Sequence, residues 1–302
     1  MIKSITVTNY VGDSIKLELT RPNDSGFIVK SVTGLGPGNS DINTTEISTS
    51  DGSLYNSARV PSRNIVISLI FLWKKTIEDV RHLSYKYFPL KRKVTLLIET
   101  DTRFAEIEGY VESNEPNIFS DQEGSDISIM CPDPFFYDPY EKTLTSFSGI
   151  EPAFEFPFSN ESLTENLIEL SIIRDVVDRV VTYKGDYEIG ITIRIQAKGE
   201  AGDISIYNVD TQEKMFIYAS SIESLTGTGI VNGDEIVICT EKNKKSAKLI
   251  RNGKTYNILN CINKDADWFH LVKGDNTFAY SSKEGRNNLR LTIENRIAYE
   301  GV

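Results

Sequence analysis

The stretch that decides the fold runs from Asn232 to Val302. It reads NGDEIVICT from Asn232 to Thr240, RNGK from Arg251 to Lys254, and LRLTIENRIAYEGV from Leu289 to Val302. The last of these alternates apolar and polar residues, as a half-buried strand does. The Asn-Gly pair in RNGK is typical of a hairpin turn whose two central residues take positive φ. The stretch therefore predicts a β-sandwich that offers a surface and no reactive centre.

Length and charge limit the wider possibilities. A chain of 302 residues is too long for one ordinary sandwich core and suits two domains. Its net charge of −10 disfavours binding to phosphate backbones. The longest apolar stretch, Ile65 to Trp73, is less than half of the roughly 20 residues that a spanning helix needs. We expect a soluble protein that makes no membrane contact.

Cysteine usage points to a reducing compartment. Cys131, Cys239 and Cys261 are odd in number and far apart, and no Cys-x-x-Cys pair occurs. A disulfide framework or a zinc knot is therefore not expected. The three side chains are better interpreted as small hydrophobic groups than as nucleophiles.

The first half of the chain alternates strand patterns with one polar segment and one helix. The segment from Asn39 to Ser62 is rich in Ser, Thr, Asn and Asp, and such a segment is either mobile or held by a partner. Ile65 to Trp73 reads as a strand buried on both faces. A helix is predicted from Thr76 to Phe88, with Thr76 as its cap and Pro89 as its stop.

A rigid exit from the first domain is predicted at Cys131 to Pro139, which contains three prolines and three aromatic residues. The boundary is expected between Thr143 and Gly149. This gives one domain at 1–145 and a second at 146–302, which begins with alternating Phe154, Phe156 and Phe158.

A set of residues distributed in order along nearly the whole chain carries a family resemblance. In the first domain the set comprises Gly34, Leu35, Asp51, Gly52, Arg59, Arg63, Pro132, Asp133 and Pro134. In the second it comprises Gly233, Asp234, Gly253, Trp268, Gly274 and Asn276. With this order and spacing the chain resembles the siphophage distal tail proteins, a family of phage tail components.

The resemblance implies a mainly β fold with two sandwich domains. The N-terminal domain would be tail-tube-like, with one flanking helix and an extended arm, and the C-terminal domain galectin-like, of jelly-roll type. It also implies a structural role at the tail tip of the virion, after assembly in the bacterial host cytoplasm. Members form a hexameric ring that joins the tail tube to the baseplate or receptor-binding apparatus and lets DNA pass.

The same resemblance implies partners. These are further copies of the chain, the tail-tube protein, a tail-associated lysin or hub protein, and receptor-binding proteins. No cofactor is implied, and nucleic acid is not bound specifically. If part of the negative charge lines the hole of the ring, DNA is repelled from the wall and slides. A contractile tail or a bacteriocin particle could use a similar protein.

The polar segment is our candidate for the arm at the ring interface. Its apolar anchors would be Ile42, Ile47, Leu54 and Tyr55. Arg59 and Arg63 are expected to pair with carboxylates such as Asp51, in the same subunit or the next. The alternative is a solvated surface loop.

Candidate chemistry elsewhere is weak. Gly34 to Gly38 resembles a dinucleotide loop only superficially, since Pro37 sits where amides should face phosphate. Glu106 and Glu108 share one strand face, as solvated carboxylates commonly do. The two histidines, His82 and His270, are widely separated and form no catalytic triad pattern. No catalytic, metal or cofactor residue is predicted, so an enzyme ranks last.

Trp268 leaves one alternative open. A tryptophan face can stack on a sugar ring, which would make the protein a carbohydrate-binding adhesion module at the host surface. The sequence around Trp268 favours a buried strand anchor before the Gly274 turn.

Overall fold

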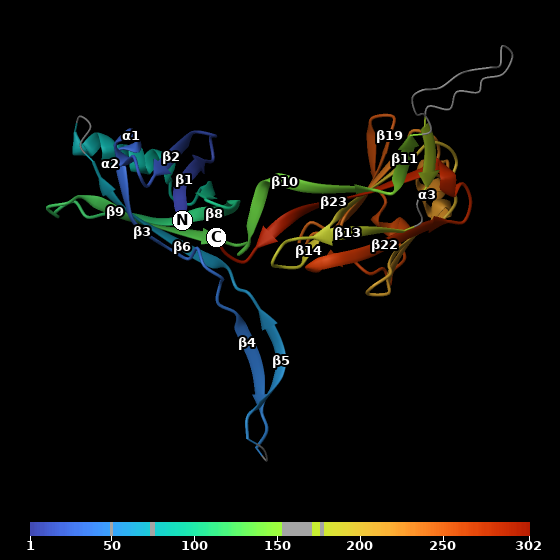
Figure 1. Cartoon of the computed structure of the whole chain (residues 1–302), viewed down its shortest axis with the longest axis horizontal. Coiled ribbons are helices and arrows are strands. Elements are labelled where there is room, and N and C mark those ends of the chain that lie inside the picture. The colour runs from blue at the N-terminus through green and yellow to red at the C-terminus, as the bar shows by residue number, and fades with distance from the viewer. Residues whose placement is uncertain (49–50, 73–75, 153–170, 176–177) are drawn as a thin grey trace, which may run out of the picture. The chain divides into compact units, whose positions relative to one another are not determined.

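The computed structural model describes residues 1–48, 51–72, 76–152, 171–175 and 178–302, which form two compact units (Figure 1). Unit 1 comprises Met1–Glu141 and Ala298–Val302, and unit 2 comprises Lys142–Ile297. Unit 2 therefore begins at Lys142 and not at the expected position 146, and the last five residues of the chain cluster with unit 1. Phe154, Phe156 and Phe158, expected to begin the second domain, lie outside the described residues.

Unit 1 is built from antiparallel strands in the order β2-β1-β7-β8-β9-β6-β3. Its elements are β1 (Ile2–Asn9), β2 (Ser14–Glu18), α1 (Pro22–Ser25), β3 (Phe27–Thr33), β4 (Asp41–Glu46), β5 (Ser53–Arg59), β6 (Arg63–Phe71), α2 (Ile77–Tyr87), β7 (Lys93–Thr100), β8 (Phe104–Pro116), β9 (Gly124–Cys131) and the first part of β10 (Phe136–Ser146).

Strand β8 belongs to both sheets of this sandwich. Its first half, up to Tyr110, pairs with β7, and its second half pairs with β9. The register shifts between Val111 and Ser113. A bulge of this kind bends a strand and raises its twist, which lets one strand turn the corner between two packed sheets.

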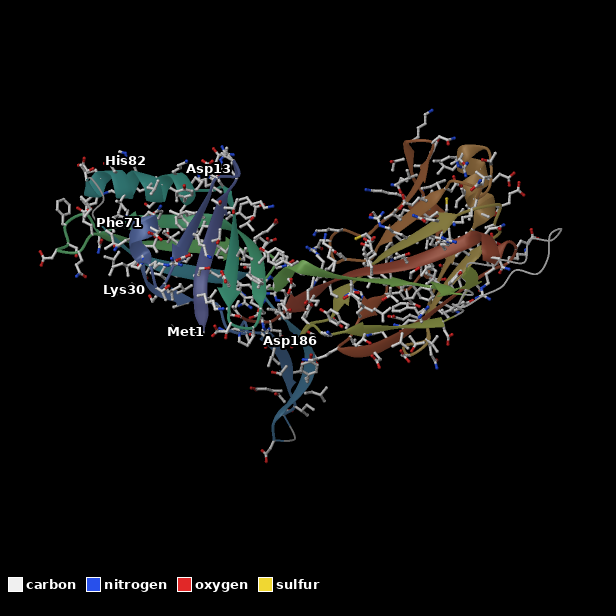
Figure 2. The ribbon with its side chains drawn as sticks, turned by 45° about the horizontal axis from the view of Figure 1, so that its top comes forward. Met1, Asp13, Lys30, Phe71, His82 and Asp186 are labelled. Atoms are coloured by element: carbon white, nitrogen blue, oxygen red, sulfur yellow. The ribbon has the colours of Figure 1, made fainter. Side chains whose placement is uncertain are left out.

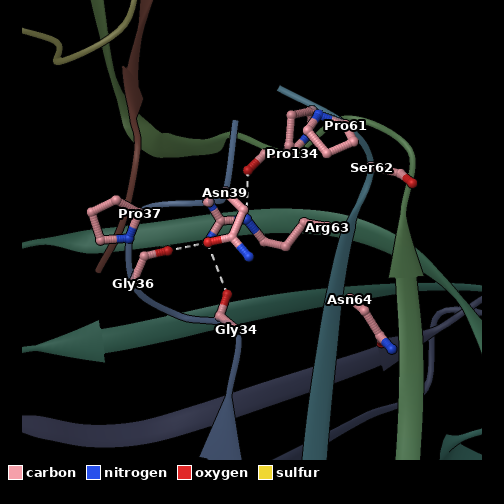
Figure 3. A pocket seen from close by; sticks show the side chains of 10 residues that line it. Gly34, Gly36, Pro37, Asn39, Pro61, Ser62, Arg63, Asn64 and Pro134 are labelled. Carbon is pink, nitrogen blue, oxygen red and sulfur yellow. Dashed lines mark hydrogen bonds between the residues drawn. The ribbon is translucent and has the colours of Figure 1, made fainter. Parts of the chain in front are cut away.

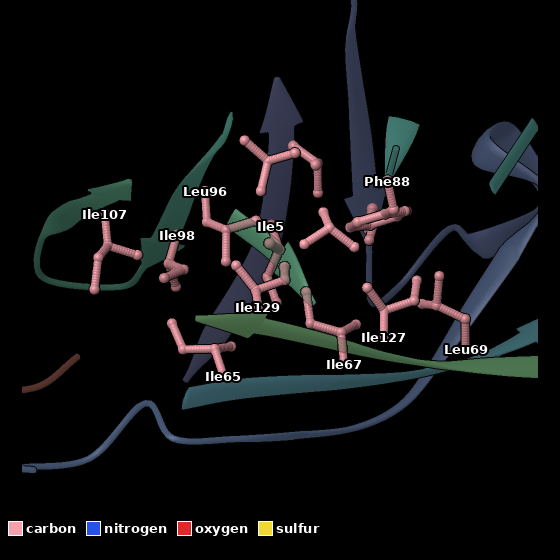
Figure 4. Close-up of a cluster of buried hydrophobic side chains, with 14 of the residues drawn as sticks. Ile5, Ile65, Ile67, Leu69, Phe88, Leu96, Ile98, Ile107, Ile127 and Ile129 are labelled. Atoms are coloured by element: carbon pink, nitrogen blue, oxygen red, sulfur yellow. The ribbon is translucent and has the colours of Figure 1, made fainter. Parts of the chain in front are cut away.

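The core of unit 1 lies between these sheets and is rich in branched aliphatic side chains (Figure 4). Strand β6 contributes Ile65, Ile67 and Leu69, which are at most 3% exposed. The intervening residues of β6 are half-buried or exposed. The prediction that this strand is buried on both faces was therefore wrong, because only one face of the sheet packs against the core.

Helix α2 confirms the predicted helix. The side chain of Thr76 accepts a hydrogen bond from the backbone N–H of Asp79 (3.1 Å), so it caps the N-terminus as expected. Val80 is buried, and Ile77 and Leu83 pack against the core. The periodicity of three and four residues therefore marks the face that covers the sandwich.

Strands β4 and β5 form a separate two-stranded hairpin in unit 1 (Figure 1). Every residue of both strands is exposed. The predicted polar segment is therefore an extended hairpin arm and not an irregular loop.

Unit 2 is also a sandwich of antiparallel strands. One sheet has the order β23-β15-β18-β19-β20 and the other β13-β22-β16-β17. The remainder of β10 leads into β11 (Ser148–Pro152), β12 (Ser171–Asp175), β13 (Asp178–Tyr183), β14 (Ile189–Gly190), β15 (Thr192–Ala197), β16 (Ile204–Asn208), β17 (Glu213–Ile217), α3 (Ala219–Thr226), β18 (Glu235–Cys239), β19 (Ser246–Arg251), β20 (Lys254–Asn257), η1 (Leu259–Cys261), β21 (His270–Leu271), β22 (Gly274–Ser282), η2 (Arg286–Asn288) and β23 (Leu289–Tyr299).

The C-terminal sequence patterns are confirmed. Asn252 and Gly253 have φ of 49° and 75° and join β19 to β20 in a two-residue turn. In β23, Leu289, Leu291 and Ile293 are fully buried. The predicted fold class is likewise confirmed: the chain is mainly β, with two sandwich units, a flanking helix and an extended arm.

Unit 2 contains a buried ion pair at the turn before β18. The Asp234 carboxylate is 1% exposed and accepts two hydrogen bonds from Arg251, at 2.7 and 2.6 Å. Arg251 Nη2 also donates to the Gly229 carbonyl oxygen (2.6 Å). The pair therefore ties the turn to strand β19.

We predict that Asp234→Ala lowers the free energy of unfolding of unit 2 by about 3 kcal/mol, because it leaves a buried guanidinium without its counter-charge. Chemical denaturation of the full chain would measure the loss. Glu235→Gln is the control, since Glu235 pairs with Arg194 at a partly exposed site and should cost under about 1 kcal/mol. Equal losses in the two variants would contradict the interpretation.

Candidate functional site

The hairpin β4–β5 displays apolar side chains that no other part of the described chain covers (Figure 2). Ile42, Leu54 and Tyr55 are 62%, 55% and 62% exposed, and Ile47 beyond the end of β4 is 41% exposed. An isolated two-stranded hairpin is marginal in water, and exposed apolar groups on it mark an interaction surface.

These groups lie on both faces of the hairpin, and a bulge sets which of them share a face. The register shifts between Asn43 and Thr44, so that Ile42 lies opposite Ala58 and Thr44 lies opposite Tyr55. Side chains alternate along a strand, so Ile42 and Tyr55 share one face. Leu54, one residue from Tyr55, lies on the other face. A partner surface can therefore bind apolar side chains on either face of the hairpin.

Polar contacts fix the base and the middle of the hairpin. Arg59 Nε lies 3.2 Å from Asp41 Oδ2, between paired residues at the base. Asn56 donates from Nδ2 to Thr45 Oγ1 (2.7 Å). Within the chain, the predicted pairing of Arg59 with Asp51 is therefore replaced by one with Asp41. Asp51 and Gly52 are exposed at the far end, where Gly52 has a φ of 91°.

Arg63, the first residue of β6, anchors the segment that leads into and out of the hairpin (Figure 3). Its side chain is buried, at 6% exposure. Nε donates to the Pro134 carbonyl oxygen (2.7 Å), and Nη2 donates to the Glu300 carbonyl oxygen (2.6 Å). Nη1 donates to the carbonyl oxygens of Gly34 and Gly36.

Among the residues that the structure describes, Arg63 forms no ion pair with a carboxylate. The guanidinium carbon of Arg63 lies 4.7 Å from the centroid of the Phe136 ring. The aromatic face and the carbonyl dipoles together stabilise the positive charge. Burial lowers the pKa of Arg63 from its ordinary value, yet a guanidinium remains charged. The expected intrachain pairing of Arg63 with a carboxylate was wrong, because Nε, Nη1 and Nη2 all donate to backbone carbonyl oxygens.

Close backbone approach explains Gly34. A Cβ at this position would lie 2.2 Å from the Asn64 carbonyl oxygen, and Gly34 has a φ of 83°. The loop from Gly34 to Gly38 presents carbonyl oxygens to a cation, which is the reverse of the amides that a phosphate loop presents. The loop is thus built around Arg63 and not around a nucleotide.

A shallow hollow of about 430 Å³ opens beside this anchor (Figure 3). It is lined by three proline rings, by small residues of the glycine loop and by polar side chains: Gly34, Gly36, Pro37, Gly38, Asn39, Pro61, Ser62, Arg63, Asn64 and Pro134.

The other family-motif residues of unit 1 serve the same region. Leu35 packs against the core, and its carbonyl oxygen accepts from the Val302 N–H (3.0 Å). Pro132 is exposed, and Asp133 accepts from the Tyr137 hydroxyl (2.8 Å). The structure therefore brings Gly34, Leu35, Arg63 and Pro134 together and leaves Asp51, Gly52 and Arg59 on the hairpin.

The motif residues of unit 2 shape turns. Gly233, Gly253 and Gly274 have positive φ, and Gly233 precedes the buried Asp234. Asn276 is 2% exposed, accepts from the Val272 N–H (3.0 Å) and donates to the Val272 carbonyl oxygen (2.8 Å). These residues hold strand connections and assemble no reactive group.

Trp268 is not the buried anchor that the sequence favoured. It is half-buried, with Lys245 Nζ 5.1 Å from the ring centroid, whereas the neighbouring Phe269 is fully buried. Phe269 packs edge-on against Phe278, with ring centroids 5.6 Å apart. Phe269 and Leu271 are both fully buried on either side of the half-buried His270, so this segment turns Phe269, and not Trp268, into the core.

The remaining candidates stand apart from one another. His82 is exposed on α2 (Figure 2), and Glu108 pairs with Lys93 at 2.6 Å. Among the residues that the structure describes, no group of three or more His, Cys, Asp or Glu side chains could hold a metal ion. No described helix has the length and apolar character to cross a bilayer.

Residues 184–296 match the family described as "Siphovirus-type tail component, C-terminal domain". None of the curated proteins matches the sequence. Among solved structures, the Dit protein of phage SPP1 aligns over 98% of this chain and 100% of its own, with a TM-score of 0.64 and 14% identity. That protein is described as a paradigm of the hub adsorption apparatus in phages infecting Gram-positive bacteria.

Two structures of the phage p2 baseplate in its activated conformation, with Sr and with Ca, match more distantly. Each has a TM-score of 0.46 and covers 97% of this chain, with identities of 11% and 12%.

The two β-sandwich units and the exposed hairpin thus form a fold that a phage tail component shares. Residues 184–296 match the siphovirus-type tail-component family, and the chain as a whole has the fold of the SPP1 Dit protein. The resemblance to distal tail proteins is confirmed.

We predict that Arg63→Met lowers the free energy of unfolding of unit 1 by about 3 kcal/mol, because it removes the charged hydrogen bonds that the buried guanidinium donates to four backbone carbonyl oxygens. Denaturant unfolding monitored by circular dichroism would measure the loss. Arg59→Met serves as the matched control, since its ion pair with Asp41 is solvent-exposed and worth under about 1 kcal/mol. Indistinguishable midpoints for the two variants would refute the role of Arg63.

Thiol chemistry should follow burial. Burial raises the pKa of the Cys131 thiol to about 12 and also raises that of Cys261, whereas Cys239 is half-buried. We expect iodoacetamide at pH 8 to alkylate Cys239 first in the native protein, because only the thiolate reacts. Peptide mass spectrometry would identify the site, and all three should react in denaturant. Preferential labelling of native Cys131 would contradict this.

Proposed function

We propose that this chain is a distal tail protein whose copies close into a hexameric ring at the tip of a phage tail. The observation that carries the proposal is the exposed hairpin β4–β5, which displays apolar groups on both faces and is fixed to a rigid base by Arg63. In a ring, the neighbouring copy would cover these groups.

Head-to-tail contact suits this hairpin. A ring forms when one surface patch of a subunit binds a different patch of the next and the rotation closes. A preformed hairpin loses little conformational freedom on docking, and its outer edges offer backbone N–H and C=O groups for pairing with a neighbour's sheet. The number six comes from the resemblance to distal tail proteins and is part of the proposal.

The acidic composition supports passage of DNA through such a ring. Six copies of a chain with a net charge of −10 carry about −60 in all. Acidic groups on the wall of the hole would repel phosphates and prevent DNA from adhering. The ring would then join the tail tube above to hub or lysin and receptor-binding proteins below.

In this proposal unit 1 makes the ring, unit 2 is the galectin-like peripheral domain, and the protein has no enzymatic role. The virion tail tip would be its final location, after assembly in the host cytoplasm. Carbohydrate binding through Trp268 has less support, because the Lys245 ammonium lies over the ring that a sugar would need.

We expect Ile42→Ser combined with Leu54→Ser and Tyr55→Ser to abolish ring formation while leaving the thermal midpoint almost unchanged. These side chains are exposed in the monomer and contribute to binding alone. Native mass spectrometry would separate a ring of about 204 kDa, six chains of 34.0 kDa, from monomer.

A variant with Val180→Ser is the control, because Val180 is 51% exposed in unit 2 and should leave the ring intact. Rings that persist in the triple variant would contradict the proposal that the hairpin forms the ring interface. A wild-type chain that stays monomeric even with its tail-tube protein would contradict the proposal of a ring.

A further inference from the structure

The turn between β8 and β9, residues 117–123, carries the most exposed apolar side chain among the described residues. Phe119 is 104% exposed, and its neighbour Ile118 is 45% exposed. The turn projects beyond the sheets at the left end of unit 1 in Figure 1. A single exposed phenylalanine on a mobile loop needs no explanation, whereas one on a fixed turn indicates a binding surface.

Contacts at both ends fix the turn. Asn117 donates its N–H to the Gly124 carbonyl oxygen (3.1 Å) and accepts the Gly124 N–H on Oδ1 (2.5 Å). The Ser120 N–H donates to the Asn117 carbonyl oxygen (3.3 Å). At Gly124 a Cβ would lie 2.1 Å from the Leu69 carbonyl oxygen, so the backbone here lies directly on β6.

Glu123 clamps the turn to two other elements. Its carboxylate lies 2.7 Å from Arg81 Nη2 of α2, and both side chains are only 15% exposed. Its carbonyl oxygen accepts the Phe71 N–H of β6 (2.8 Å). Pro116 restricts the backbone just before the turn. The aromatic ring is therefore displayed from a braced support, and it needs little further ordering to bind.

The segment that contains β8, the turn and β9 carries acidic side chains and no basic ones. From Phe104 to Glu141 the sequence contains no Lys, Arg or His, whereas Asp and Glu recur throughout. Glu115, Asp121 and Asp126 lie on or beside the turn. Arg81 pairs with a fourth acidic residue of the turn, Glu123. Such a rim repels anionic lipid surfaces and other acidic copies, and it attracts a basic surface.

We propose that residues 117–123 form a docking knob for a second kind of protein. Phe119 and Ile118 enter an apolar pocket on that partner, and lysine or arginine side chains around the pocket face Glu115, Asp121 and Asp126. The surface is separate from the hairpin. The inference rests on the proposed function only in taking the partner to be another tail component.

Site-specific photo-crosslinking in assembled particles tests this. A benzophenone amino acid at position 119 is expected to crosslink to one other tail protein, at a peptide that contains apolar residues and Lys or Arg. The same probe at Val11, which is 67% exposed at another turn of unit 1, should yield about tenfold less. The yield at 119 should fall when particles assemble at high salt, because the charged rim is screened.

Phe119→Ser and Asp121→Lys should each weaken incorporation of the partner about tenfold, while the 34.0 kDa chain keeps its ring mass and thermal midpoint. If the rings are intact, a crosslink from position 119 to lipid or to a second copy of this chain, or no crosslink at all, would contradict the proposed docking knob. If the wild-type chain forms no ring, the proposed function is contradicted instead.

Discussion

The guanidinium of Arg63 holds together parts of unit 1 that are remote in sequence. It binds carbonyl oxygens from the glycine loop, from the loop before β10 and from the C-terminal tail. The Arg63 side chain is buried, and a hydrogen bond made by a charged group contributes about 1.5–3 kcal/mol. One side chain therefore fixes the point from which the hairpin projects. It also explains why the last five residues cluster with unit 1.

Arginine suits this position for a geometric reason. Its planar fork offers donors in fixed directions, and a lysine could not reach oxygens on opposite sides at once. The aromatic face of Phe136 covers the plane of the fork, at 4.7 Å. Unit 2 uses arginine at Asp234 in a related manner, but there a carboxylate supplies the main acceptor. In both units an arginine side chain binds carbonyl oxygens of a loop and so holds together segments that make few contacts with each other.

The sequence predicted what short-range chemistry controls. Period-two alternation identified β23, the Asn-Gly pair identified the turn between β19 and β20, and Thr76 identified the start of α2. It could not predict contacts between distant residues. Arg63 and Glu300 are separated by 237 positions, and no local pattern says that one will bind the other's carbonyl oxygen. For Trp268 and Phe269, adjacent aromatic residues gave no signal for which would face the core.

The sequence of the hairpin was likewise ambiguous, since its polar composition fits either a mobile segment or one held by a partner. The paired strands β4 and β5 favour the second interpretation. Ordering a residue costs about 1–2 kcal/mol of conformational entropy, and this hairpin recovers none of it by burying apolar surface within its own chain. Its strand pairing, the Arg59–Asp41 contact and the Arg63 base hold it extended nonetheless. A segment that is ordered, exposed and apolar on both faces gains its missing stabilisation when a second surface covers it. The apolar groups that the monomer leaves exposed on both faces of the hairpin therefore support the proposed assembly over a solvated loop, independently of any resemblance.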